Sequence, residues 1–312
     1  MLKSNNKAIL ITMGDPAGIG AEVTAKALLK VRFPKGVEPV VIGDQAVWQK
    51  FWPADKSWPL FIHLASRART VHRPGLPTVE SGRDSLLYLE KAVELIKEGR
   101  AQALVTAPVA KEAICRFIPG FKGHTTFLAR AFGLKNVEML FLADAMKLVL
   151  VTRHVSLMEV PAMITADKVF AVIKTTYDFL VARSGKRNLK VAVLGLNPHA
   201  GENGHMGQEE IRHIKPAMKR LRAVGVDVHG PFPADTFFEP RNCHGYDLLS
   251  AMYHDQALTV LKAQYFDRLV NMTIGLPFIR TSPAHGTAFG IAGKGIADEG
   301  SMLAAIKAAV SV

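Results

Sequence analysis

Short apolar runs and amphipathic segments alternate along nearly the whole chain. The apolar runs occupy residues 8–13, 39–42, 103–106 and 190–196, and helical spacing of apolar residues extends over 81–98, 166–180 and 208–224. Residues 139–142 and 148–152 are expected to pair as strands across a turn at Asp144, and residues 295–312 have the pattern of a terminal helix. This alternation predicts an α/β fold, with helices covering both faces of a mostly parallel sheet.

The length and composition favour two domains without a membrane anchor. The chain has 312 residues, of which 49% are hydrophobic, enough to form two cores. No apolar run reaches the ~18 residues of a transmembrane helix, and the N-terminus does not have the pattern of a signal peptide. The two cysteines, Cys115 and Cys243, lack metal-ligand or redox-motif spacing, which is typical of a reducing compartment. We therefore expect a cytoplasmic protein that does not bind membranes.

The formal net charge of +12 raises the question of nucleic-acid binding. The basic residues are scattered and interleaved with acidic ones, as in LEKAVELIKEGR, and they form no basic block with interleaved aromatic residues. We therefore expect no nucleic-acid partner. A positive field that attracts small anionic molecules accounts better for this charge.

Three histidines each follow an apolar run and begin or lie within a polar cluster. His154 lies in TRHVSL, His199 in NPHAGENGHMG and His254 in MYHDQALTVLK. Neutral imidazoles suit a divalent transition metal that keeps open positions for substrate. The separations of 45 and 55 residues are too long for a local zinc finger, so the fold would have to assemble such a site. Histidines at strand ends are also common as structural residues, and both interpretations stay open here.

Polar turns in the first half of the chain allow a functional and a structural interpretation. GDPAGIG, residues 14–20, lacks the spacing of GxGxxG and is either a tight strand-to-helix turn or a polar turn that faces an active cleft. Lys111, in TAPVAK, begins a helix and faces either an anion or solvent. His124 begins the helix of GHTTFLA, where Thr125 or Thr126 either caps the helix or lies beside a bound phosphate.

A second polar set lies near the third histidine. Lys262, Asn271 and Arg280 are types suited to a phosphate or carboxylate, since arginine supplies a bidentate fork and lysine a point charge. The glycine-rich stretch at residues 285–302 permits close approach of the backbone to a flat ligand, or it is simply the loop before the terminal helix.

Seven blocks, in order, resemble the 4-hydroxythreonine-4-phosphate dehydrogenase family of vitamin B6 synthesis. They are GDPAGIG, TAPVAK, GHTTFLA, NPHAGENGHMG, MYHDQALTVLK, NMTIGLPFIRTS and HGTAFGIAGKGIAD, and the match extends over residues 8–305. The last block also resembles the cofactor loop of isocitrate and isopropylmalate dehydrogenases. The resemblance implies two α/β/α domains with mixed, largely parallel sheets and an active cleft between them. We expect the first domain at 1–120 plus 290–312, and the second, with the metal ligands and a dimer interface, at 121–289.

The resemblance also implies roles for individual residues. The divalent metal, zinc, magnesium or cobalt, would be held by His154, His199 and His254, with His254 contributed across the interface of a homodimer. The substrate-binding residues would be His124, Thr125, Lys262, Asn271 and Arg280, and the cofactor-binding residues His285, Gly286, Thr287, Ala288 and Asp298. Asp235, in FPADTFF, and Lys262 are the candidates for proton transfer. Arg153, where the family more usually has threonine, leaves the substrate preference open.

The activity that the resemblance implies is oxidation of 4-hydroxy-L-threonine 4-phosphate by NAD or NADP. The β-keto acid formed would lose CO2 to give 3-amino-1-hydroxyacetone 1-phosphate. Alternatives within the family are oxidation of 4-phospho-D-threonate, of 4-phospho-D-erythronate or of a cis-dihydrodiol. An alternative of a different class is a non-catalytic protein that binds metal or nucleic acid.

Overall fold

The computed structural model describes residues 7–65, 71–144 and 146–311 and divides into two compact units. The first comprises Met1–Val137 with Phe266–Val312, and the second comprises Glu138–Tyr265. The C-terminal segment joins the N-terminal one, and the units divide at 137/138 and 265/266, whereas domain boundaries at 120/121 and 289/290 were expected from the sequence. Residues 266–289 belong to the first unit because the strand at Ile279–Pro283 pairs with the strand at Ala103–Thr106.

The sheet of the first unit has the strand order β3-β2-β1-β4-β11-β10. Its strands are β1 (Lys7–Thr12), β2 (Val37–Gly43), β3 (Leu60–His63), β4 (Ala103–Thr106), β10 (Val270–Ile274) and β11 (Ile279–Pro283). Neighbouring strands are parallel except β10 and β11, which form a hairpin that places Thr273 opposite Arg280. The apolar stretch from Asn271 to Arg280 is therefore divided by a turn, at Gly275 with φ 96°.

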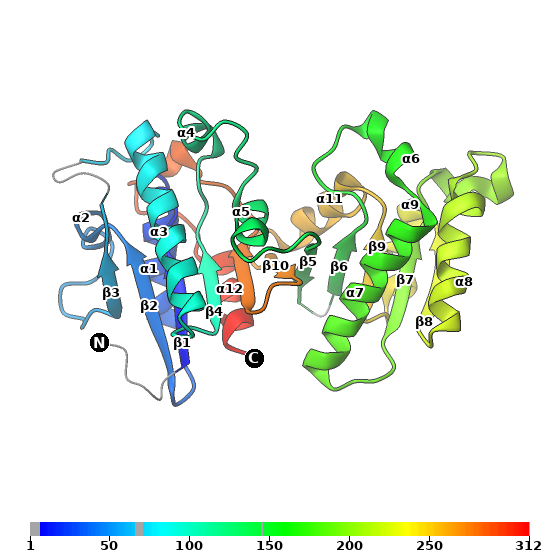
Figure 1. Cartoon of the computed structure of the whole chain (residues 1–312), viewed down its shortest axis with the longest axis horizontal. Helices are drawn as coiled ribbons and strands as arrows, with labels where there is room; N and C mark the ends of the chain where they lie inside the picture. Colours follow the sequence, from blue (N-terminus) through cyan, green and yellow to red (C-terminus); the bar gives the residue numbers. More distant parts are fainter. Residues whose placement is uncertain (1–6, 66–70, 145, 312) are drawn as a thin grey trace. The chain divides into compact units, whose positions relative to one another are not determined.

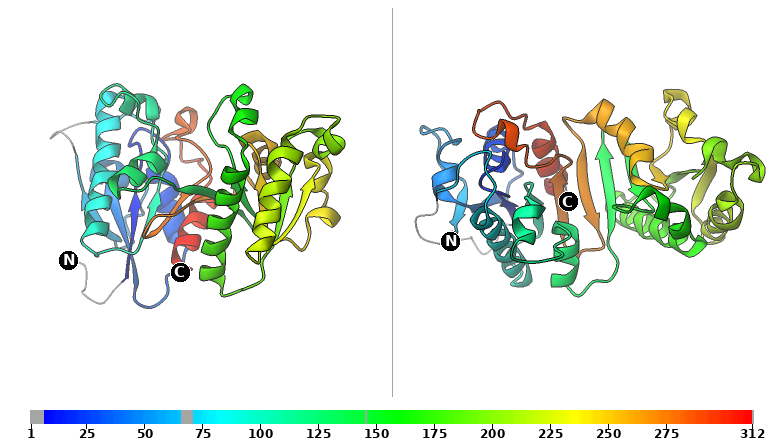
Figure 2. Two further views of the ribbon diagram at one scale, coloured as in Figure 1. Left: turned by 45° about the vertical axis from the view of Figure 1, so that its right-hand side comes forward. Right: turned by 90° about the horizontal axis from the view of Figure 1, so that it is seen from above.

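Helices cover both faces of this sheet, as the sequence predicted (Figure 1). α1 (Gly20–Lys30) and α12 (Gly300–Val310) pack together on one face, and α3 (Val79–Lys97) and α4 (Lys111–Cys115) lie on the other, as Figure 2 also shows. The unit also contains the short helices α2 (Gln45–Trp48) and α5 (His124–Ala131). α12 begins later than predicted because residues 295–299 form a loop, in which Gly295 has φ 72°.

The second unit has the strand order β5-β6-β9-β7-β8. Its strands are β5 (Glu138–Ala143), β6 (Met146–Leu150), β7 (Lys190–Leu194), β8 (Asp227–Phe232) and β9 (Leu248–Ala251). β5 and β6 pair antiparallel on either side of Asp144, which confirms the predicted turn. β6, β9, β7 and β8 run parallel, so their carboxyl ends lie along one edge of the sheet.

In the second unit, α7 (Ala166–Ser184) and α8 (Lys215–Ala223) lie side by side on one face of the sheet, and α11 (His254–Tyr265) lies on the other (Figures 1 and 2). The short helices are α6 (Val160–Met163), α9 (Ala234–Phe237) and α10 (Pro240–Cys243). The helix predicted over 208–224 begins with a π-helical turn at Glu210–Ile214 and continues directly into α8. In the described parts of the chain, no helix combines the length and apolar character needed to cross a bilayer.

Candidate active site

Four candidate residues follow the parallel strands of the second unit at the point where each strand ends. His154 follows β6, His199 follows β7, Asp235 follows β8 and His254 follows β9. Because the carboxyl ends of parallel strands share one edge of the sheet, residues up to 100 positions apart come to the same edge. Ligands gather at this edge in α/β folds.

Hydrogen bonds between neighbouring strand ends fix this edge. Thr152 donates from its backbone N–H and from Oγ1 to the carbonyl oxygen of Met252, at 3.0 and 2.7 Å. The side-chain amide of Gln256 donates to the carbonyl of Gly195 at 2.6 Å, and Gly195 N–H donates to the carbonyl of Phe232 at 2.8 Å. The segments that carry the three histidines and Asp235 are therefore joined to one another.

Two of the three histidines are neighbours. The ring centroids of His154 and His254 lie 5.6 Å apart within one chain, and Nδ1 of His254 lies 2.6 Å from Oδ1 of Asp255. Neither side chain belongs to the core, since His154 is exposed and His254 is half-buried, and this argues against the purely structural interpretation. Across residues 7–65, 71–144 and 146–311, no three His, Cys, Asp or Glu side chains gather closely enough to hold a metal ion. The donor type of the pair fits a transition metal, and His199 is not placed with it as a third ligand.

His199 begins a turn whose backbone is left-handed over five consecutive residues. The φ values of residues 199–203 lie between 41° and 79°, and only residue 201 is a glycine. A left-handed conformation costs roughly 1–2 kcal/mol for each other residue, and such strain is common at functional sites. Nδ1 of His199 lies 2.5 Å from Oε1 of Glu202, and this contact, with a smaller contribution from Asp235, raises the pKa of His199. A metal ion at His199 would have to compete with that proton.

Glu210 anchors the start of the left-handed turn. Its buried carboxylate accepts hydrogen bonds from the backbone N–H groups of Leu196 and Asn197, at 2.7 and 2.8 Å, and from the Asn197 side chain at 2.9 Å. Sequence reasoning missed Glu210, which lay unremarked at the start of an amphipathic segment. Its signal was an acidic residue on the buried side of a helix, directly after a glycine-rich loop.

Arg280, in the first unit, is a buried cation without a carboxylate partner among the described residues. It is 2% exposed, and Nη1 and Nη2 donate to the hydroxyls of Thr273 and Thr106, at 3.0 and 2.6 Å. Nε is buried without a hydrogen-bond partner in the described structure. Burial lowers the pKa of Arg280 to about 10, so the guanidinium stays charged near neutral pH. A buried, uncompensated charge is costly, and an anionic ligand would compensate it.

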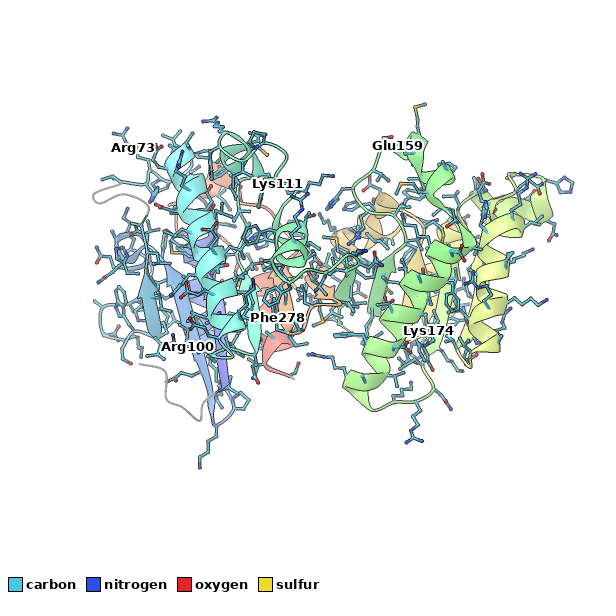
Figure 3. All side chains as sticks on the ribbon, in the orientation of Figure 1. Arg73, Arg100, Lys111, Glu159, Lys174 and Phe278 are labelled. Carbon is cyan, nitrogen blue, oxygen red and sulfur yellow. The ribbon has the colours of Figure 1, made fainter. Side chains whose placement is uncertain are left out.

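His124 and Lys111 meet at the start of α5. His124 is the first residue of α5, and burial, Arg280 and Lys111, in that order, lower its pKa. Lys111 begins α4 and lies against Gly123, since a Cβ atom at Gly123 would be 3.1 Å from Cε of Lys111 (Figure 3). Gly123, with φ 108°, is the N-cap of α5 and offers no capping side chain, so of the two interpretations of Thr125 and Thr126 the capping one is wrong. The first N–H groups of a helix and nearby cations favour an anion.

The other predicted substrate residues are distributed over both units. Asn271 is on β10, and its Oδ1 is buried without a hydrogen-bond partner in the described structure. Thr125 is half-buried in the first turn of α5, and Lys262 is half-buried on α11 of the second unit. Asp235, the candidate base, is exposed on α9. The first unit thus brings His124, Lys111 and Arg280 to one anion-attracting region.

The structure favours the structural interpretation of GDPAGIG. Asp15 is fully buried and accepts hydrogen bonds from Ala17 N–H at 2.9 Å and from the Ser81 hydroxyl at 3.3 Å. Burial raises the pKa of this carboxyl. Asp44, the acidic residue at the end of the next strand, is the N-cap of α2 and accepts from Val47 N–H at 3.0 Å. Both acids therefore hold turns.

The predicted cofactor residues lie on a loop that presents mainly backbone. Gly286 and Ala288 are exposed, and an added Cβ at Gly286 would meet nothing within 4 Å. The carbonyl of Thr287 accepts from Ile19 N–H at 3.1 Å. Asp298 is exposed, and its Oδ1 accepts from the N–H of Gly300, the first residue of α12, at 2.7 Å. Like His285, these residues follow β11, at the same edge of the sheet as GDPAGIG.

Known proteins match the chain over nearly its whole length. It is 39% identical to a 4-hydroxythreonine-4-phosphate dehydrogenase of Trichlorobacter lovleyi, with 97% of each protein covered. It is 38% identical to a putative D-threonate 4-phosphate dehydrogenase of Oceanobacillus iheyensis, over 99% of this chain and 98% of the relative. The crystal structure of a 4-hydroxythreonine-4-phosphate dehydrogenase from Klebsiella pneumoniae is similar with a TM-score of 0.82 and 36% identity, covering 98% of this chain and 100% of that one.

The fold alone is shared with a β-decarboxylating dehydrogenase of Thermococcus kodakarensis, at a TM-score of 0.50 and 16% identity, over 97% of this chain and 82% of that one. A likeness of this kind confirms the predicted fold class. The family model described as pyridoxal phosphate biosynthetic protein PdxA matches residues 28–309. The chain therefore belongs to the PdxA family.

Proposed function

We propose that this chain is a dehydrogenase that oxidises 4-hydroxy-L-threonine 4-phosphate, with NAD or NADP as the hydride acceptor, in the synthesis of pyridoxal phosphate. Family membership and the names of the relatives support the reaction class. The observation that carries the choice of a phosphorylated substrate is the buried, uncompensated guanidinium of Arg280, with His124 and Lys111 beside it.

The anion-binding residues hold the phosphate in this proposal. Arg280 is fixed by Thr106 and Thr273, so little side-chain entropy is lost when a phosphate binds beside its guanidinium. The lowered pKa keeps His124 neutral near pH 7, and its single ring N–H can then donate to the phosphate. The orphaned Oδ1 of Asn271 is available to a donor on the substrate, such as its hydroxyl or ammonium group.

His154, His199 and His254 would hold a divalent metal, zinc, magnesium or cobalt. When bound, the metal would supply a Lewis acid for negative charge on the substrate oxygen, and the nicotinamide would supply the hydride acceptor. Asp235 is proposed to accept the hydroxyl proton, and Lys262 to return a proton after the product β-keto acid loses CO2. The bond broken in that loss joins the carboxylate to the amino-bearing carbon, and the product is 3-amino-1-hydroxyacetone 1-phosphate.

A cytoplasmic homodimer is part of the proposal, with His254 supplied to the partner's site. The close pair of His154 and His254 within one chain offers the simpler alternative of a site with both ligands from the same chain. Mixing the His199→Ala and His254→Ala variants distinguishes the two. Activity restored on mixing two inactive variants shows a shared site, whereas no restoration in demonstrated mixed dimers shows that each chain supplies its own ligands.

A turnover assay tests the proposed function. The purified protein is supplied with NAD or NADP, a divalent metal and either 4-hydroxy-L-threonine 4-phosphate or its unphosphorylated form, and NAD(P)H is measured at 340 nm. We expect turnover of the phosphorylated substrate only. Absence of turnover with the phosphorylated amino substrate would refute the assignment.

A second candidate substrate is 4-phospho-D-threonate. It is the alternative arm of the assay, because the relative from Oceanobacillus iheyensis, named a putative D-threonate 4-phosphate dehydrogenase, is 38% identical to this chain. Arg153, beside the first histidine, also departs from the residue expected, and it acts electrostatically on Glu138. Preferential turnover of 4-phospho-D-threonate in the same assay would identify it as the substrate in place of the amino compound. The proposed phosphate-binding role of Arg280 would stay the same.

A further inference from the structure

Two side chains of α1 hold the loop that precedes α12. Glu22 is fully buried, and its Oε1 accepts hydrogen bonds from the backbone N–H of Ala297 and from Nζ of Lys26, both at 2.8 Å. Nζ of Lys26 also donates to the carbonyl oxygens of Gly295 and Ala297, at 2.9 and 2.8 Å. Glu22 and Lys26 form an ion pair one helical turn apart on α1. Together they hydrogen-bond three backbone groups of a loop that lies about 270 residues later in the chain.

The turn that leads into α1 supports the same loop at a second point. Ile19 N–H donates to the carbonyl of Thr287 at 3.1 Å. A Cβ atom at Gly18 would lie 3.0 Å from that carbonyl oxygen and 3.2 Å from Cβ of Thr287, so the two segments touch where only glycine fits well. Both ends of the 285–299 loop are thus fixed by residues 18–26.

The face of the loop away from these contacts is accessible. Gly286, Gly290 and Asp298 are exposed, and added Cβ atoms at the two glycines would meet nothing within 4 Å. A loop that binds through its backbone has few side chains of its own to fix its shape. Its affinity then depends on how much ordering has to occur on binding.

We propose that Glu22 and Lys26 are positioning residues that hold the 285–299 loop in the shape that binds the nicotinamide cofactor. This inference rests on the proposed function and on the cofactor-binding role that the family resemblance implies for residues 285–288 and Asp298. It gives α1 a role in cofactor affinity, although neither side chain has to touch the cofactor.

The test compares Lys26→Met with Lys174→Met. Lys174 is a matched control, because it also forms an i,i+4 ion pair, with Asp178 on α7, and its side chain is also 32% exposed (Figure 3). NADH and NADPH binding to the whole protein is measured by fluorescence titration. For the nucleotide that the wild type binds, Lys26→Met is expected to raise Kd by about tenfold or more, and Lys174→Met by less than about twofold.

Comparing cofactor affinity with kcat and KM distinguishes a positioning role of Lys26 from a general disturbance of the fold. At saturating cofactor, Lys26→Met is expected to keep the KM for the phosphorylated substrate and kcat within about twofold of wild type, and Lys26→Arg to recover most of the cofactor affinity. Unchanged cofactor affinity in folded Lys26→Met, or equal losses in both lysine variants, overturns the inference while leaving the proposed function intact. A wild type that binds neither nucleotide overturns the proposed function itself.

If Lys26→Met does not fold, Gly18→Ala with Gly225→Ala as its control gives an independent test. The Gly18 change presses on Thr287, whereas the Gly225 change adds a methyl group in the second unit, where no neighbour lies within 4 Å. Weaker NADH binding in Gly18→Ala alone supports the inference. Equal binding in the two variants contradicts it.

Discussion

Replacing Arg280 by methionine separates a ligand-binding arginine from a structural one. A pKa that falls from the ordinary 12.5 to about 10 corresponds to about 3 kcal/mol spent to bury the charged group. The variant recovers that cost but leaves the hydroxyls of Thr106 and Thr273 without their donors, at roughly 1 kcal/mol each. The two effects nearly cancel, so we expect the free energy of unfolding to change by no more than about 1 kcal/mol.

The affinity for substrate should change far more. A guanidinium in a charge-assisted contact with phosphate contributes about 3 kcal/mol or more, so the KM for the phosphorylated substrate should rise about 100-fold in Arg280→Met. Urea unfolding gives the stability and steady-state kinetics at saturating cofactor give KM. Arg100→Met, which removes an exposed arginine paired with Glu98, is the control and should change neither quantity appreciably.

A large loss of stability in Arg280→Met without a change in KM would contradict this prediction. Removal of one member of a buried ion pair destabilises a protein by about 3–5 kcal/mol. If Arg280→Met loses that much stability and keeps its KM, the arginine is structural and the reasoning from its missing carboxylate is wrong. An independent check is inorganic phosphate, which at 100 times its Kd should stabilise the wild type by about 2.7 kcal/mol and should not stabilise the variant.

Three further predictions concern the two units separately. Because folding lowers the pKa of His124, its contribution to the free energy of unfolding is complete above pH ~6.5 and is lost as the pH falls from there toward the folded pKa. Urea unfolding measured against pH should therefore show a shallower loss of stability in His124→Asn than in the wild type. Identical pH profiles would contradict this prediction. Glu210→Ala leaves two buried N–H groups without acceptors, so we expect urea unfolding to show a free energy of unfolding lower by about 2–4 kcal/mol. Cobalt binding, measured in an absorption titration, should also weaken. Unchanged stability would show that Glu210 does not anchor the turn. Lys111→Met should raise the KM for the phosphorylated substrate about tenfold. The control is Lys122→Met, which removes an exposed lysine nearby and should leave KM unchanged. Equal effects of the two variants would exclude a specific role for Lys111.

The strands were the most predictable part of the fold. The apolar run at residues 103–106 is β4 to the residue, and β5 and β6 pair across Asp144 as expected, because a short buried strand has a continuous apolar sequence. The run from Asn271 to Arg280 was less predictable. It folds back on itself at Gly275, and the apolar pattern alone does not mark that turn.

The candidate site was predictable in its residue types and much less so in its supporting residues. His154, His199 and His254 lie at strand ends as their sequence clusters indicated. Thr106 could not be linked to Arg280, because the contact joins residues 174 positions apart and depends on which strands become neighbours. Glu210 was equally hidden, since a local sequence pattern does not show that a carboxylate turns inward to meet two backbone N–H groups.

The decisive measurement is a crystal structure with a divalent metal and 4-hydroxy-L-threonine 4-phosphate bound. We expect the phosphate within hydrogen-bond distance of Arg280 and His124, and the metal on the imidazoles of His154, His199 and His254. A phosphate bound elsewhere, with the guanidinium of Arg280 still bonded to the two threonines alone, would contradict this expectation.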